Sequence, residues 1–165
     1  MSRPVKSEMI SVALTVADLE RATRFYCEGL GFEEMQTLVI GNELAHMAGV
    51  EGEFRLLERF IRCGDTLINL LHAEIPRIAQ TMSAPRAGTL GLSHIVVRVD
   101  DLENALARVV EFGGVVHEDS RSHHDNPGVG RTDIINCSDP DGNRIEMLTL
   151  PDSVKTWLET PKAAG

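Results

Sequence analysis

The chain of 165 residues is poor in aromatic side chains, cysteine and basic residues, and it has no long apolar run. No stretch approaches the roughly 20 apolar residues of a membrane-spanning helix, so we expect no membrane span. The N-terminal residues, MSRPVKSEM, lack the apolar core of a secretory signal, and the cysteines are widely spaced. Cys63 and Cys137 are expected to be packing residues. These features predict a soluble protein of the reducing cytoplasm.

The charge balance is acidic. There are 16 Lys and Arg residues against 25 Asp and Glu residues, which gives a formal net charge of −9. Nucleic acids and anionic membrane surfaces bind clusters of Lys and Arg that neutralise phosphates. We therefore expect no nucleic-acid partner and no membrane partner, whereas a cationic or small neutral ligand is compatible with this charge.

What the chain does have is an internal repeat. Residues 11–32 align without a gap with residues 94–115, and residues 64–71 align without a gap with residues 141–148. The match includes hydrophobic, acidic and glycine positions. The two halves are therefore expected to fold as copies of one structural module.

The two copies differ at positions that could carry chemistry. Ser11 stands opposite His94, and Asn69 stands opposite Glu146. One copy thus has an imidazole and a carboxylate where the other has a hydroxyl and an amide. A functional account of this chain must explain that asymmetry.

The hydrophobic pattern predicts the same elements in each copy. Alternating apolar residues predict strands at 10–16 and 94–99. Asp18 and Asp101 follow at the N-cap positions of amphipathic helices, which glycines end. Three further strands are expected in each copy: 32–40, 54–62 and 66–73, then 115–120, 131–137 and 143–150.

The predicted fold class is α+β, with two tandem βαβββ modules that form one curved mixed sheet with helices on its convex side. We expect one domain, 1–165, with these parts: a first module 9–74, a linker 75–90, a second module 91–150 and a C-terminal tail 151–165 with a short helix. A pseudo-twofold axis between the modules would bring the four differing positions together on the inner face. The modules could pair within one chain or between two chains.

Three segments carry a family resemblance: ADLERATRFYCEGLGF, SHIVVRVDDLENAL and DPDGNRIEMLTL. They resemble the vicinal oxygen chelate superfamily over roughly residues 9–150. This superfamily includes glyoxalase I, methylmalonyl-CoA epimerase, extradiol dioxygenases, fosfomycin resistance enzymes and bleomycin-binding proteins. The region that links the copies is most similar to the epimerase-like branch.

The resemblance implies a divalent metal, held by a His on the first strand and a Glu or Gln on the last strand of each module. His94 and Glu146 match this pair in the second module, whereas Ser11 and Asn69 depart from it in the first. The candidate metal site is therefore His94, Glu146 and the carbonyl oxygen of Asn69, with Fe, Mn, Ni, Zn, Co or Mg as the ion. The alternative is that His94 and Glu146 bind each other or a substrate without a metal.

Other residues are expected around the same pocket, together with Ser11. Arg98 and Arg144 share the inner face and could each clamp a carboxylate or phosphate, or form a salt bridge at the rim. His123 and His124 fall in a polar stretch that is expected to be a loop, 120–131, and could cover the pocket as an acid or base, or simply face solvent.

The leading functional prediction is a metal-assisted isomerase, lyase or dioxygenase that acts on a small oxo or hydroxy compound or a thioester, with Glu146 as a catalytic carboxylate. One alternative is a metal-free protein that sequesters a ligand such as a drug. The aromatic content of 4% argues against the stacking surfaces such binders use. Another alternative is a metal-free enzyme in which His94 and Glu146 act as an acid–base pair. A homodimer is expected from the resemblance and from the prevalence of twofold symmetry.

Overall fold

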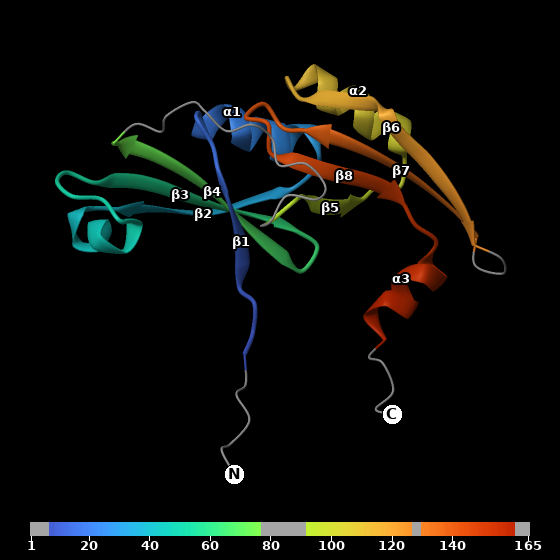
Figure 1. Ribbon diagram of the computed structural model, residues 1–165, viewed down its shortest axis with the longest axis horizontal. Coiled ribbons are helices and arrows are strands. Elements are labelled where there is room, and N and C mark those ends of the chain that lie inside the picture. Colours follow the sequence, from blue (N-terminus) through green and yellow to red (C-terminus); the bar gives the residue numbers. More distant parts are fainter. Residues whose placement is uncertain (1–6, 77–91, 127–129, 161–165) are drawn as a thin grey trace, which may run out of the picture. The chain divides into compact units, whose positions relative to one another are not determined.

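The computed structural model describes residues 7–76, 92–126 and 130–160 (Figure 1). The chain divides into two compact units, Met1–Gln80 and Thr81–Gly165, which are described here one at a time. Most of the predicted linker lies outside the described residues. Among those residues, no helix has the length and apolar character needed to cross a membrane.

The first unit contains a four-stranded sheet. Its elements are β1 (Ser11–Thr15), α1 (Leu19–Thr23), the π-helical turn η1 (Arg24–Gly29), β2 (Glu33–Ile40), the 3-10 helix η2 (Asn42–Ala48), β3 (Arg55–Cys63) and β4 (Thr66–Ile75). The strand order is β1-β4-β3-β2. Strand β1 runs parallel to β4, and the other pairs are antiparallel. Helix α1 is packed against β3 and β4 of this sheet.

The second unit repeats this arrangement. Its elements are β5 (Ile95–Arg98), α2 (Leu102–Glu111), β6 (Val115–Asn126), β7 (Gly130–Ser138), β8 (Arg144–Thr149) and α3 (Asp152–Glu159). The strand order is β5-β8-β7-β6, again with one parallel pair, β5 and β8. Two mixed sheets in two βαβββ units confirm the α+β class and the tandem modules.

Strand register supports the alignment of the two copies. Ala13 pairs with Asn69 in the first unit, and Val96 pairs with Glu146 in the second. These are equivalent positions of the repeat. Asn69 and Glu146 therefore occupy the same place in their respective sheets.

The helices α1 and α2 begin directly after the Asp residues that the sequence predicts as their N-caps. Asp18 Oδ1 accepts a hydrogen bond from the backbone N–H of Arg21 at 2.9 Å, and Asp101 Oδ1 accepts one from Asn104 at 3.0 Å. Each carboxylate satisfies a backbone donor that the first helical turn leaves free. Both predicted N-caps are confirmed.

The core of each unit lies between the sheet and its helix. In the first unit, the buried residues Leu14, Ile61 and Leu70 pack on this side. In the second, Val97 and Met147 do the same. Because strand side chains alternate, the residues between them point to the opposite side, which we call the far face of each sheet.

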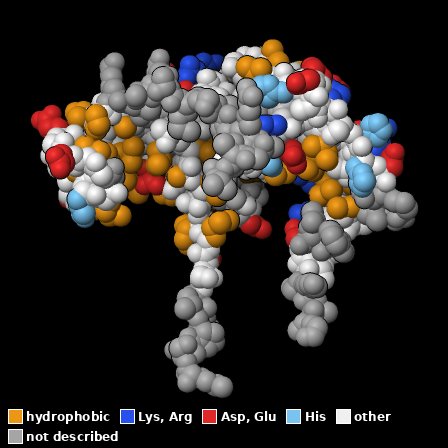
Figure 2. Space-filling model, viewed as in Figure 1, with side chains coloured by type: hydrophobic (Ala, Val, Ile, Leu, Met, Phe, Trp, Pro, Cys, Tyr) orange, Lys and Arg blue, Asp and Glu red, His pale blue; other side chains and the backbone are white. Residues whose placement is uncertain are grey.

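Several hydrophobic side chains remain at the surface of the first unit (Figure 2). Leu38 and Val39 on β2 are 48% and 58% exposed, and Met47 on η2 is 74% exposed. Strand β2 lies at the edge of its sheet. These residues therefore contribute little to the core described above.

The prediction of a loop at 120–131 is wrong for residues 120–126, 130 and 131, which are in strands, whereas residues 127–129 lie outside the described residues. Strand β6 continues to Asn126, and His123 and His124 pair with Asp133 and Thr132 of β7. The polar composition suggested a loop, but an edge strand can be polar because one side of it faces solvent. Since neighbouring strand residues alternate, the two histidines point to opposite faces.

Candidate functional site

The second unit brings His94 and Glu146 together. His94 immediately precedes β5, and Glu146 lies in the middle of β8. The distance from His94 Nε2 to Glu146 Oε2 is 3.8 Å, and the side chains are 31% and 26% exposed. The Oγ of Ser93 lies 2.9 Å from Nδ1 of His94, so the ring is held through its other nitrogen. Nε2 is thus the ring atom available to a ligand near the carboxylate.

This pair fits a divalent cation in donor type and in spacing. Imidazole nitrogen and carboxylate oxygen each bind such ions at about 2.0–2.2 Å, and an ion between two donors 3.8 Å apart is compatible with these lengths. The contact of Ser93 is of the kind that orients a ligating histidine. Among the residues described, no group of three or more His, Cys, Asp or Glu could hold an ion. The second unit would therefore supply two ligands, and substrate or water would complete the shell. Asn69, the third predicted ligand, lies in the first unit.

Further polar side chains surround Glu146 on the far face of the second sheet. Asn136 pairs in register with both Glu146 and His117, and Ser138 pairs with Arg144. Cross-strand partners point to the same side of a sheet. We call these five residues together the polar patch.

Hydrogen bonds organise the polar patch. Arg144 Nε donates to Asn136 Oδ1 at 3.0 Å. His117 Nε2 and Ser138 Oγ lie 2.8 Å apart. Sequence reasoning missed His117, Asn136 and Ser138, because the copies do not match there and the register between strands is not visible in the chain. The alternation of Asn136 and Ser138 with the apolar Ile135 and Cys137 along β7 was an available signal.

The two predicted arginines have different surroundings. Arg98 forms an ion pair with Asp152 at the start of α3, with Nη2 2.7 Å from Oδ1. This corresponds to the salt bridge at the rim that was one of its two predicted roles. Arg144 is half-buried and, within the described part of the chain, forms no ion pair. Arg144 therefore keeps the capacity to bind an anion.

The first unit has an amide–carboxylate pair at the equivalent position. Asn69 is 8% exposed, and its Nδ2 donates to Glu58 Oε1 at 2.5 Å. The Oδ1 of Asn69 is buried and has no hydrogen-bond partner in the described segments. Ser11 lies half-buried at the start of β1 on the same far face.

Glu58 is a carboxylate of the first unit that sequence reasoning missed as a candidate site residue. Glu58 pairs in register with Leu38 on one side and Leu71 on the other, so it lies in an apolar row of the far face. The pairing with Asn69, eleven residues later, depends on the β3–β4 hairpin and is not readable from either residue alone.

The structure separates His123 from Glu146. His123 lines a cavity of about 650 Å³ next to the start of α2, on the helix-covered side of the second sheet. Glu146 lies on the far face, and His124, which is exposed, points to that side as well. Of these two histidines, His124 is therefore the one on the same side as the polar patch.

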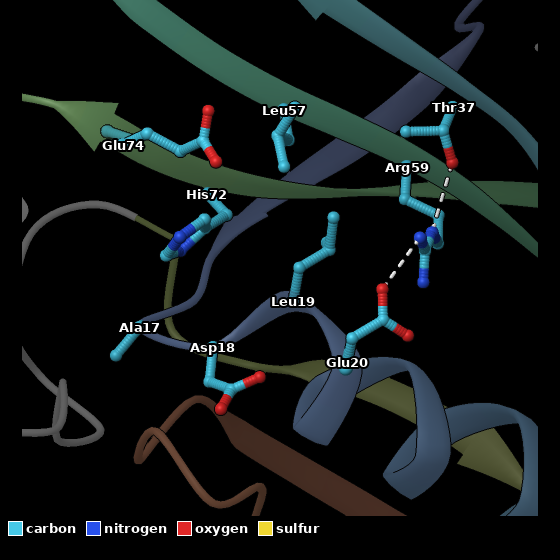
Figure 3. A pocket seen from close by; sticks show the side chains of 10 residues that line it. Ala17, Asp18, Leu19, Glu20, Thr37, Leu57, Arg59, His72 and Glu74 are labelled. Atoms are coloured by element: carbon cyan, nitrogen blue, oxygen red, sulfur yellow. Dashed lines mark hydrogen bonds and ion pairs between the residues drawn. The ribbon is translucent and has the colours of Figure 1, made fainter.

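A cavity of about 570 Å³ lies in the first unit beside the start of α1 (Figure 3). His72 and Glu74 project into it from β4, and Arg59 closes its other end. Its charged residues already have partners: Arg59 bonds Glu20 at 3.0 Å, Glu74 pairs with Arg55, and His72 Nδ1 lies 3.2 Å from the carbonyl oxygen of Val16. This cavity is on the helix-covered side, away from Asn69. Its side chains hold α1 and the sheet together.

The cysteines have the character of packing residues. Burial raises the pKa of the Cys137 thiol to about 12, with Asp139 adding to the effect. Burial likewise raises the pKa of Cys27 to about 11 and raises that of Cys63. Thiols with raised pKa values carry little thiolate at neutral pH and are poor nucleophiles.

Comparison with known proteins places this architecture in a family. The family model of the Glyoxalase/Bleomycin resistance protein/Dioxygenase superfamily matches residues 9–147. A comparison with curated protein sequences finds no significant match. The match does not distinguish the methylmalonyl-CoA epimerase-like branch, which stays a prediction.

Solved structures agree on the fold. A glyoxalase family protein from Bacillus cereus is 16% identical with a TM-score of 0.76, and the alignment covers 92% of this chain and 99% of that one. The trypanothione-dependent glyoxalase I of Leishmania major is 19% identical with a TM-score of 0.57, covering 93% and 94%. The fosfomycin resistance protein FosX of Mesorhizobium loti is 17% identical with a TM-score of 0.51, covering 93% and 99%. From the family match over most of its length, and from the tandem βαβββ units, the chain belongs to the Glyoxalase/Bleomycin resistance protein/Dioxygenase superfamily.

Proposed function

We propose that this protein is a divalent-cation-assisted isomerase, lyase or dioxygenase that acts on a small oxo or hydroxy compound or a thioester. The observation that carries the proposal is the pair formed by His94 and Glu146, with 3.8 Å between Nε2 and Oε2. The pair lies on the far face of the second sheet beside Arg144 and Asn136. A fold shared by many reactions does not choose among these three classes.

His94 and Glu146 would hold the cation. When bound, such an ion polarises a substrate oxygen and stabilises the negative charge that develops there. Ser93 keeps the imidazole ring of His94 oriented through Nδ1. With only two protein ligands, the substrate's own oxygens are needed to complete the coordination. Binding of the ion and of the substrate is therefore expected to be cooperative.

A metal-free acid–base enzyme is the second candidate. It is favoured by the lack of a third His, Cys, Asp or Glu donor beside the pair among the described residues. In this case Nε2 of His94 exchanges a proton with the substrate, and Glu146 stabilises the imidazolium through its negative charge. Both candidates require the same two side chains.

Metal content and metal binding separate the two candidates. Elemental analysis of protein purified without chelators or a His tag, followed by calorimetric titration of the apoprotein with Mn²⁺, is expected to give one ion per chain. H94A and E146Q are expected to lose it, while H124A, which removes an exposed histidine of the same unit, keeps it. Equal ion binding by H94A and wild type would contradict the proposed site. No ion in any variant would favour the acid–base enzyme.

The homodimer and the cytoplasmic location also stay predictions. Sedimentation velocity of the purified protein tests the first directly. A single monomeric species at micromolar concentration would contradict it.

A further inference from the structure

We propose that the polar patch binds an oxyanion group of the substrate, a carboxylate or a phosphate, and that Arg144 is the residue that clamps it. This inference rests on the proposed function, because it names the class of substrate that would bind at the same site on the far face of the second sheet. It predicts an anionic substrate for a protein whose own net charge is −9.

The first argument is the charge around Arg144. Carboxylate oxygens lie within 4.0 Å of these arginines: Arg24, Arg55, Arg59, Arg62, Arg98, Arg108, Arg121 and Arg131. Arg144 is half-buried, and its one hydrogen bond within the described part of the chain is to an uncharged amide, that of Asn136. A partly desolvated charge without a counter-charge is unfavourable. An anion at this place would supply the counter-charge.

The second argument is the geometry of the guanidinium group. Its Nε already donates to Asn136 Oδ1 at 3.0 Å, which fixes the plane of the group on the sheet. Neither Nη atom has a hydrogen-bond partner among the described residues, so both remain as donors there. Two parallel N–H donors match the two oxygens of a carboxylate or phosphate, and a lysine at the same position could not reproduce this fit.

The third argument is the neighbouring hydroxyl. Ser138, 6% exposed, is the register partner of Arg144, and its Oγ lies 2.8 Å from His117 Nε2. With the ring hydrogen on Nε2, Ser138 accepts from His117 and keeps its own O–H as a donor. The patch then offers a guanidinium and a neutral hydroxyl donor on adjacent strands.

Glu146 is the one acidic member of the polar patch, two residues from Arg144 on the same strand face. Its negative charge opposes an incoming anion. A cation held by His94 and Glu146 would remove this repulsion. The inference therefore predicts that anion binding improves when Glu146 is neutralised.

The probes are malonate, inorganic phosphate and the uncharged malonamide, titrated calorimetrically into chelator-treated wild-type protein. We expect malonate or phosphate to bind and malonamide not to bind. R144M is expected to weaken the binding about tenfold or more, and R144K to weaken it by a smaller factor. R98M is the matched control, because Arg98 lies on the same face but is already paired with Asp152. E146Q is expected to bind the anion at least as well as wild type.

The outcomes are distinct. A preference for malonate indicates a carboxylate substrate, and a preference for phosphate indicates a phosphorylated one. Equal affinity of R144M and wild type, with matching circular dichroism spectra, would overturn the inference. So would failure of both anions to bind wild type at up to about 10 mM. Because these titrations use metal-free protein, their result is independent of whether H94A and E146Q lose an ion.

Discussion

At the scale of single residues, Asn69 is the most informative difference between the two copies. It occupies the place of Glu146 in the first sheet, and its amide donates to Glu58 at 2.5 Å. A carboxylate at position 69 would put two negative charges at hydrogen-bond distance. The departure from the expected Glu or Gln is therefore accompanied by a carboxylate that needs a donor: that of Glu58, two residues before Phe60, the register partner of Asn69.

The substitution N69D tests this pairing. We expect it to lower the free energy of unfolding by about 2–3 kcal/mol at pH 7, because a donor is lost and a like charge is gained. The pKa of the introduced carboxyl is raised in the folded state. The variant should therefore approach wild-type stability at low pH and lose it as the pH rises through that raised pKa. Urea unfolding at pH 4 and pH 7 measures both.

N104D is the control for N69D, since Asn104 is exposed on α2 and the substitution makes the same change of net charge. It should change stability by less than about 0.5 kcal/mol. A pH-independent loss in N69D would show that the amide acts through packing rather than through Glu58.

The thiols provide a second prediction at this scale. With a pKa of about 12, Cys137 is expected to hold roughly one part in ten thousand as thiolate at pH 8, so it should be the slowest cysteine to react with a disulfide reagent. Cys27, with a pKa of about 11, should react faster than Cys137. In guanidinium chloride all three should react at the rate of a free thiol. Rapid native labelling of Cys137 would mean that the site opens or that its thiol is activated.

At the scale of elements, Arg59 joins α1 to the sheet of the first unit (Figure 3). Its side chain is 13% exposed. It donates to Thr23 Oγ1 at 2.9 Å, to Thr37 Oγ1 at 3.0 Å and to Glu20 at 3.0 Å. Since α1 is a single short helix, this one guanidinium supplies much of its polar attachment.

We expect R59M to lower the free energy of unfolding by about 2–4 kcal/mol, because several polar groups lose their partner at once. R62M is the matched control on the same strand. Arg62 pairs with Glu33 but is 44% exposed, so its loss should cost less than about 1 kcal/mol. Urea unfolding compares the two variants. Equal losses of unfolding free energy would mean that the hydrogen bonds of Arg59 contribute no more than a surface ion pair.

At the scale of the whole molecule, the sequence repeat corresponds to equivalent backbone positions in the two units. The registers of Asn69 and Glu146 coincide, and Ser11 and His94 each lie two residues before the partner of that position. What differs is the side chains that the common backbone presents. The cation binding that we propose for the second unit should therefore be transferable to the first.

Grafting tests this equivalence. The triple substitution S11H, N69E and E58Q gives the first unit the His–Glu pair of the second and removes the competing charge of Glu58. In a background of H94A, it is expected to restore binding of Mn²⁺ in calorimetric titration to within about tenfold of wild type. The same background with S11A in place of S11H should not bind. A folded triple variant that takes up no ion would contradict the equivalence of the two sites.

Some of this protein was readable in the chain. The alternation of Val12 and Leu14 predicted β1, and the capping positions of Asp18 and Asp101 are confirmed by hydrogen bonds. These features are local, because strand periodicity and helix capping depend on residues a few positions apart. The polar end of β6 was missed for the same reason, since its strand character comes from pairing with β7.

The sequence by itself determined the two modules and their element order. It also determined the two differences between them, Ser11 in place of His94 and Asn69 in place of Glu146. Only the tertiary structure decided which side chains meet: Glu58 with Asn69, Arg144 with Asn136, and His117 with Ser138. Each of these contacts joins different strands. Pairing register places such residues side by side, and register is set by the packing of whole sheets rather than by the spacing of residues along the chain.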